Sequence, residues 1–422
     1  MESTFRLRRK TSRTLGARIA MLPVSAALVL AAGCSHPSAT SSGGAPAPKV
    51  SMSLTAPNPD PRVGLQAGLH DAGEAVWNLR VLSQTPPSAK FVGITNSDLA
   101  FTGNYAIQGS YAGYQIWDIS NPSSPSLKTA FFCPASQSDV SVYKNLLFVS
   151  GEGLTGRLDC GGEGVKDTVS KERLRGLRIF DLSDIANPKN VGNVQTCRGS
   201  HTHTVLVDPK DPDNVYVYIS GSSRVRSPNE LAGCVAAAPA ADSNSALFRI
   251  EVIKVPLAHP EQAAIVSSPR IFNNLVAPAR HGDSPVDLAE EQKELADARA
   301  KGAFIATIRG KEQPVPSFFV KPMLDSIVAA RHGTGEATSA DSAALRAALP
   351  DMIAKRFAAT PGTENLGPTQ CHDITVYPAI GRAGGACEGY GMLLDITDPA
   401  HPVRLDAVSD SNFSYWHSAT FN

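Results

Sequence analysis

A recurring turn constrains the fold of this chain more than any other feature of its sequence. In three places an apolar run ends in Asp, a Ser or Thr follows two residues later, and a proline comes soon after. These copies are residues 115–122, 177–188 and 392–399, and residues 250–260 form a degraded fourth copy. The apolar run is typical of a β-strand, which proline ends because it cannot donate to a β-ladder. Such a period predicts an array of similar units.

Each of these turns is preceded by further strand-like segments. Residues 97–101 precede 104–107, residues 138–142 precede 146–149, and residues 203–207 precede 215–219, while residues 372–376 begin a fourth group. Each unit then has four short strands and cannot bury both faces of its sheet alone. We therefore expect an all-β fold in which four-stranded blades stack around an axis as a β-propeller. An antiparallel sandwich built from hairpins is the alternative.

The repeats resemble the LVIVD-repeat family of bacterial β-propellers. In that family, an inner strand with small residues or His precedes a strand that ends in Asp and a Pro turn. The resemblance extends over roughly residues 75–422 with one insertion, and it implies a fold but no particular function. Residues 416–422 match the start of another inner strand, so we expect a truncated chain or an incomplete ring. Residues 76–82 are a candidate for an outer edge strand.

The insertion at residues 273–367 has a different pattern. Residues 287–301 and 342–357 place apolar side chains at helical spacing, which predicts two amphipathic helices. Asp341 and Ser342 are candidate caps of the second helix, and Pro350 is expected to kink or split it. This helical insertion is either a lid or partner surface on the propeller or a loop without a role.

The N-terminal segment has the order of an export signal. Basic residues between Arg6 and Arg13 precede an apolar stretch at residues 19–32, and Gly33-Cys34 follows. The stretch is shorter than the roughly 20 residues of a membrane-spanning helix, which is the alternative. The sequence from Leu30 to Cys34 resembles the lipobox of bacterial lipoproteins, although Leu30 lies four residues before Cys34 where three is usual. The resemblance implies that residues 1–33 are removed and that Cys34 carries a lipid anchor.

Composition and charge extend this prediction. Residues 34–75 are rich in Ser, Gly, Ala and Pro and are expected to form a flexible tether before the blades of residues 76–422. Ser35 favours the outer membrane of the cell envelope. The first 33 residues hold six of the 39 basic residues and one of the 39 acidic ones, which leaves 33 against 38. Without a basic stripe the remaining chain is not expected to bind nucleic acid.

Six cysteines remain besides Cys34, an even number that suggests disulfides in an exported chain. The spacing favours pairs between neighbours in sequence, because the ends of one hairpin lie close together. These pairs are Cys133 with Cys160, Cys197 with Cys234, and Cys371 with Cys387. Zinc ligation is the alternative, although the chain has no Cys-x-x-Cys.

Histidines recur on the strands expected to line the axis. We align His203, His372 and His417 at one position of this inner strand, with Ser97 and Ser138 at that position in earlier copies. Asp98, Asp139 and Asp373 are then channel carboxylates, and His201 points to the same side as His203. Imidazoles with nearby carboxylates are candidate ligands of a divalent transition metal. In the alternative, these side chains hydrogen-bond the backbone of the next blade.

Two functions follow from these predictions. The first is an envelope-anchored scaffold that binds a protein, peptide or glycan. The second is a metal-dependent enzyme whose site is the histidine group at the mouth of the axial channel. No Gly-x-Ser-x-Gly, His-Glu-x-x-His or phosphate-binding Gly-Lys-Ser/Thr motif occurs in the chain, so no catalytic residue is assigned.

Overall fold

The structure is a computed structural model that describes residues 52–66, 68, 71–278, 282–308, 310–358, 362–363, 366–413 and 415–421. The chain divides into two compact units, Met1–Arg80 and Val81–Asn422. The expected signal segment and the lipid site at Cys34 lie outside the described residues.

The described part of the first unit contains no helix or strand. Its two ends are joined by hydrogen bonds in which the backbone N–H of Ser53 donates to the side chain of Asn78 at 2.9 Å and the Asn78 amide donates back at 2.8 Å. Residues 76–82 form no strand, so the prediction of an outer edge strand there is wrong.

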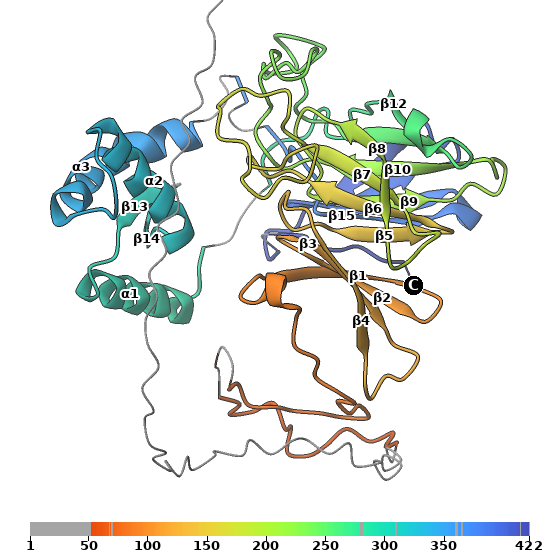
Figure 1. Cartoon of the computed structure of the whole chain (residues 1–422), viewed down its shortest axis with the longest axis horizontal. Coiled ribbons are helices and arrows are strands. Elements are labelled where there is room, and N and C mark those ends of the chain that lie inside the picture. Colours follow the sequence, from red (N-terminus) through yellow and green to blue (C-terminus); the bar gives the residue numbers. More distant parts are fainter. Residues whose placement is uncertain are drawn as a thin grey trace, which may run out of the picture. The chain divides into compact units, whose positions relative to one another are not determined.

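Four antiparallel sheets of four strands build the second unit, and each runs in sequence order from an inner to an outer strand (Figure 1). Blade 1 contains β1 (Asn96–Thr102), β2 (Tyr105–Ser110), β3 (Gly113–Asp118) and β4 (Ser126–Phe132). Blade 2 contains β5 (Val140–Tyr143), β6 (Leu146–Gly151), β7 (Gly176–Asp181) and β8 (Lys189–Gln195). Blade 3 contains β9 (Thr202–Leu206), β10 (Asn214–Ser220), β11 (Glu251–Pro256) and β12 (Ala264–Ser267). Blade 4 contains β15 (Asp373–Tyr377), β16 (Arg382–Cys387), β17 (Tyr390–Asp395) and β18 (Val403–Val408). The all-β prediction of four-stranded blades is confirmed.

The recurring Asp ends the third strand of three blades and starts the turn that follows. A carboxylate oxygen of Asp118 accepts hydrogen bonds from the hydroxyl and backbone N–H of Ser120, at 2.6 and 3.0 Å. Asp181 does the same with Ser183, and Asp395 accepts from the backbone N–H of Thr397. These bonds from Ser120 lower the pKa of Asp118 to about 2. The Asp-x-Ser/Thr sequence is thus a local turn device, since such side chains satisfy the backbone where a strand ends.

The blades stack face to face. Their first strands β1, β5, β9 and β15 are neighbours in this order (Figure 1). In β6, Leu147 belongs to the core shared with blade 1, whereas Phe148 belongs to the core shared with blade 3. In β10, Val217 and Tyr218 divide in the same way between blades 2 and 4. Because alternate residues of a strand face opposite sides, both faces of each middle sheet are buried, as stacked blades require and a two-layer sandwich does not.

The helical insertion contains α1 (Pro285–Ala300), the hairpin β13 (Ile305–Ile308) and β14 (Lys311–Pro314), α2 (Ser317–Ala330) and α3 (Ser339–Phe357). The two expected helices correspond to α1 and α3, while α2 was missed because its sequence is mostly apolar and contains Pro322. The prediction of Asp341 or Ser342 as the N-cap of α3 is wrong, because Thr338 is the N-cap and Asp341 completes a capping box with it. The helix also continues through Pro350, with Leu349 and Ile353 buried on either side of it.

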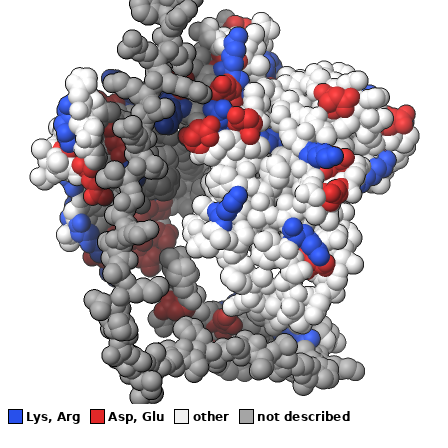
Figure 2. Space-filling model, viewed as in Figure 1, with Lys and Arg blue, Asp and Glu red and all other residues white. Residues whose placement is uncertain are grey.

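Two surface properties bear on function. Among the described residues visible in Figure 2, Lys and Arg side chains are interspersed with Asp and Glu and form no stripe of one sign. Within the part of the chain that the structure describes, no helix has both the length and the apolar character needed to cross a membrane.

Candidate metal site at the inner strands

Strand pairing fixes which inner-strand residues are equivalent. The first strands end at Thr102, Tyr143, Leu206 and Tyr377, each paired across its hairpin. Counting back five residues from each end gives Ser97, Ser138, His201 and His372. The predicted alignment of His203 with His372 is therefore wrong by two residues, and His201 occupies that position. The cause is the longer hairpin of blade 3, where seven residues separate β9 from β10.

The two histidines at the corrected position lie close to each other and to His417, which belongs to the segment after blade 4. The ring centres of His372 and His417 lie 3.5 Å apart, and those of His201 and His372 lie 5.1 Å apart. Ligand atoms of His372, Asp373 and His417 all lie within 4.8 Å of one another. We call His201, His372, Asp373 and His417 the histidine cluster. His372, Asp373 and His417 supply two imidazoles and one carboxylate within reach of one ion, and His201 adds a third imidazole beside His372, a donor set that suits Zn, Cu, Fe or Ni.

Glu152 holds His201 in place. Its carboxylate lies 2.6 Å from Nδ1 of His201 and accepts from the hydroxyl and backbone N–H of Ser222 at 2.7 and 3.2 Å. Burial raises the pKa of Glu152, but hydrogen bonds and charge from His201 and Ser222 outweigh it and lower the pKa overall. The hydrogen bond that Nδ1 of His201 donates to Glu152 raises the pKa of His201. With Nδ1 bound to a carboxylate, Nε2 is the nitrogen left to bind a metal, as in carboxylate–histidine–metal arrangements.

His372 is only partly satisfied by the protein. Its Nδ1 is buried and has no hydrogen-bond partner among the described residues, although it lies 3.4 Å from a carboxylate oxygen of Asp373. A buried polar atom without a partner costs free energy. A cation placed between His372, Asp373 and His417 would remove this cost and offset the charge of Asp373. The residues present therefore fit a metal ion.

His203 belongs to a different arrangement. Its fully buried ring has Nδ1 at 2.8 Å from the hydroxyl of Ser150 and 3.0 Å from a carboxylate oxygen of Asp139, and the Ser150 hydroxyl lies 2.8 Å from that of Ser200. We call Asp98, Asp139, His203, Ser150 and Ser200 the inter-blade network. The assignment of His203 to the metal group is thus a misplacement, because its ring turns toward blade 2.

Two of the three predicted carboxylates join neighbouring blades. Asp98 of blade 1 accepts a hydrogen bond from the backbone N–H of Val140 at 3.0 Å, and Asp139 accepts from that of His203 at 2.9 Å. Burial and the charge of Asp139 raise the pKa of Asp98. Burial also pushes the pKa of Asp139 up, but His203 lowers it overall. Asp98 and Asp139 therefore hydrogen-bond the next blade, the alternative left open by the sequence, and Asp373 alone of the three carboxylates joins the histidine cluster.

Sequence reasoning missed Glu152 and Arg198. Glu152 directly follows β6, whose end lies beside the start of β5, so its place after a second strand was a usable signal. Arg198 donates to the backbone oxygens of Ser223 at 3.0 Å and Thr369 at 2.6 Å, and burial lowers its pKa to about 10. It thereby fixes the segment that leads into His372. No local pattern predicted this contact between residues 171 positions apart.

The cysteines form the three predicted disulfides, Cys133–Cys160, Cys197–Cys234 and Cys371–Cys387. All six are therefore occupied, and zinc ligation by these cysteines is contradicted. The third disulfide joins Cys371, the residue directly before His372, to Cys387 at the end of β16. It thus restrains the backbone that carries two members of the histidine cluster.

Comparisons with known proteins match the repeat. Residues 95–132, which span blade 1, match the family model of the LVIVD repeat. No curated protein matches the chain. Among solved structures, the chain is similar to a hypothetical selenium-binding protein from Sulfolobus tokodaii, at 11% identity and a TM-score of 0.27. That match covers 73% of this chain and 59% of the other, so the chain spans less than two thirds of that protein.

Proposed function

We propose that this LVIVD-repeat scaffold binds one divalent transition metal ion at the histidine cluster. The observation that carries the proposal is the meeting of His201, His372 and His417 from blade 3, blade 4 and the segment after blade 4. His417 is exposed, so one side of the cluster is open to solvent and to a further ligand of the metal. A metal with an open position also supports catalysis, which keeps a metal-dependent enzyme within this proposal.

Metal analysis of the purified, untagged full chain tests the proposal. We expect about one Zn, Cu, Fe or Ni ion per chain. The variant with His201, His372 and His417 all changed to Ala is expected to hold none. Its matched control changes His259, His332 and His401, which lie outside the cluster, and is expected to keep the metal. A metal-free natural chain, or a cluster variant that keeps its metal, contradicts the proposal.

We also propose that the protein is exported and anchored to the cell envelope through a lipid on Cys34. The basic, apolar and small-residue order before Cys34 supports this localisation, and the three disulfides agree with an oxidising compartment. The test is incorporation of labelled palmitate and membrane fractionation. We expect Cys34→Ser to lose the label and to leave the membrane fraction. Equal labelling of both chains would rule out this anchor.

A second candidate function, protein binding, concerns the inner face of blade 1, by which we mean the face of its sheet that carries Leu99 and points away from blade 2. Leu99 is 53% exposed, whereas Val140, His203 and Ile374, at the same strand position of the later blades, are 3%, 7% and 5% exposed. In blades 2, 3 and 4 the preceding blade covers the residue at this position. The open face therefore continues the inter-blade interface, and we assign it to a blade of a second copy of the chain. Peptide and glycan ligands, also expected from the sequence, stay predictions.

Sedimentation of the full chain over a range of concentrations tests this surface. We expect the natural chain to self-associate and Leu99→Asp to remain monomeric. Leu405→Asp, on the outer strand β18 and 49% exposed, is the matched control and should self-associate as the natural chain does. A natural chain that is monomeric throughout, or equal association of both variants, would refute this role.

A further inference from the structure

The helical insertion has its own core and beside it an open cavity. Ala306, Val315, Leu349 and Ile353 form the buried core between the hairpin β13–β14 and α3. The cavity, of about 610 Å³, lies next to this core and is bounded by the hairpin, α2 and the α2–α3 loop. Its size falls within the range of roughly 300–1,000 Å³ that is usual for small-molecule sites.

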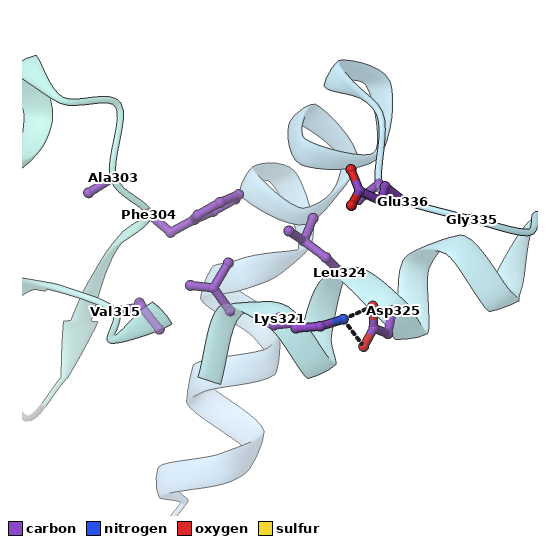
Figure 3. A pocket seen from close by; sticks show the side chains of 10 residues that line it. Ala303, Phe304, Val315, Lys321, Leu324, Asp325, Gly335 and Glu336 are labelled. Atoms are coloured by element: carbon purple, nitrogen blue, oxygen red, sulfur yellow. Dashed lines mark hydrogen bonds and ion pairs between the residues drawn. The ribbon is translucent and has the colours of Figure 1, made fainter. Parts of the chain in front are cut away.

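The walls of the cavity are apolar. Phe304 and Val315 approach it from the hairpin side, and Val320 and Leu324 approach it from α2. Figure 3 shows the side chains of Phe304 and Leu324 pointing into the same hollow. Such walls favour a ligand with an aliphatic or aromatic body, because the apolar surface of both is then removed from water.

Ion pairs and hydrogen bonds fix the shape of the cavity. The guanidinium of Arg346 stacks on the ring of Phe304 at 4.3 Å and donates to the backbone oxygen of Ala303 at 2.9 Å. On the other side, Arg331 donates to both carboxylate oxygens of Asp341 at 2.5 and 2.7 Å, and Asp341 closes the capping box with Thr338. These contacts hold both ends of the α2–α3 loop. A site formed before the ligand arrives loses less free energy in ordering.

The charges at the rim select the head group of a ligand. Lys321 and Asp325 form an ion pair at 3.0 Å on α2, drawn as dashed lines in Figure 3. Glu336, on the α2–α3 loop, has no Lys, Arg or His partner within 4.0 Å among the described residues. Among the residues that line the cavity, one Lys, one Asp and one Glu leave an excess of one negative charge, and Arg346, which stacks on Phe304, lies outside this lining. This charge complements a cation.

We infer that the cavity of the helical insertion binds a small amphipathic cation, an amine with an aliphatic or aromatic body, whose ammonium group lies beside Glu336. The apolar body fills the space between Phe304, Val315 and Leu324. This site is distinct from the histidine cluster and needs no metal.

The experiment uses three ligands with one body and different heads: dodecylammonium, dodecanol and dodecanoate. Each displaces the neutral fluorescent probe N-phenyl-1-naphthylamine from the full chain, below the concentration at which it forms micelles. We expect dodecylammonium to bind about three- to fivefold more tightly than dodecanol, the effect of one exposed charge pair, and dodecanoate to bind most weakly. Glu336→Gln should remove the advantage of dodecylammonium and leave dodecanol unchanged.

Filling the cavity tests its location. Leu324→Trp should abolish displacement by all three ligands, whereas Leu288→Trp, on α1 and outside the cavity, should bind them as the natural chain does. Ala337→Phe fills the cavity from its exposed rim and gives the same test without altering the core. Unchanged binding in a folded Leu324→Trp or in Ala337→Phe overturns the site. Tightest binding of dodecanoate, or an ammonium preference that survives Glu336→Gln, overturns the ligand class.

Discussion

The histidine cluster and the inter-blade network both contain residues at the start of the inner strands but have different roles. In the network, Asp139 and Nδ1 of His203 are used inside the protein, on each other, on Ser150 and on the backbone, while Nε2 of His203 is enclosed without a partner among the described residues. In the cluster, Nδ1 of His372 has no hydrogen-bond partner among the described residues, and His417 is exposed. A recurring polar residue on an inner strand is therefore structural where two blades enclose it, as they do His203. It is a candidate for function where it lies beside an exposed side chain, as His372 lies beside His417.

The largest expected effect is on stability, from Asp139→Ala. This change removes the acceptor of a buried backbone N–H and the partner of His203, so we expect a loss of about 3–5 kcal/mol in the free energy of unfolding. Urea denaturation measures it. Asp373→Ala, compared in the metal-free chain, is the matched control, because Asp373 starts β15 as Asp139 precedes β5. Among the described residues it accepts no hydrogen bond from another blade, so the change should cost less than about 1 kcal/mol. Equal losses would erase the distinction between network and cluster.

The next effect is on metal affinity, from Glu152→Gln. An amide orients the His201 ring less firmly and no longer makes its nitrogen more basic, so we expect roughly a 10- to 100-fold weaker affinity in a chelator competition titration. Glu261→Gln is the control, because Glu261 also lies beside a histidine, His259 at 3.1 Å, but on the exposed surface. Unchanged affinity in Glu152→Gln would remove Glu152 from the site.

A smaller effect compares one strand position in two blades. Ile374 is buried against blade 3, so Ile374→Val should cost about 1 kcal/mol in the free energy of unfolding. Leu99 is exposed at the equivalent position of blade 1, so Leu99→Val should change stability by less than about 0.5 kcal/mol. Denaturation well below the concentration of self-association measures both. A larger loss for Leu99→Val would show that the inner face of blade 1 is covered in the monomer.

The smallest effect is the pH dependence of the metal-free chain. The raised pKa of His201 gives stability that is complete below its ordinary value of 6.5 and is lost as pH rises through the raised value. The lowered pKa of Glu152 gives stability that is present above 4.5 and is lost as pH falls through the lowered value. The pair of His201 and Glu152 therefore contributes most to the free energy of unfolding between pH 4.5 and pH 6.5. Compared with Glu152→Gln, the natural chain should lose its advantage in urea unfolding as pH rises above 6.5 through the raised pKa of His201, and a constant advantage would contradict the pairing.

Much of the fold follows from local chemistry and was predictable. The Asp-x-Ser/Thr turns of Asp118, Asp181 and Asp395 satisfy their own backbone, so they mark the ends of strands wherever they occur. Disulfides between neighbours in sequence follow from the short span of a hairpin or its adjoining loop. The helical spacing of residues 287–301 was enough to identify α1. The mostly apolar α2 had no such periodicity, and its helical form depends on packing within the insertion.

The site was only partly predictable, for the same reason. The sequence by itself determined that blades recur and that histidines lie near the starts of inner strands, because these depend on side chains close together in the chain, and it favoured the pairing of neighbouring cysteines. Only the tertiary structure decided that His201 and not His203 lies beside His372, and that Glu152 orients His201. It also decided that Asp139 accepts a hydrogen bond from the neighbouring blade. These facts depend on strand register and on contacts between distant residues, and a hairpin longer by a few residues shifts the register without leaving a local signal.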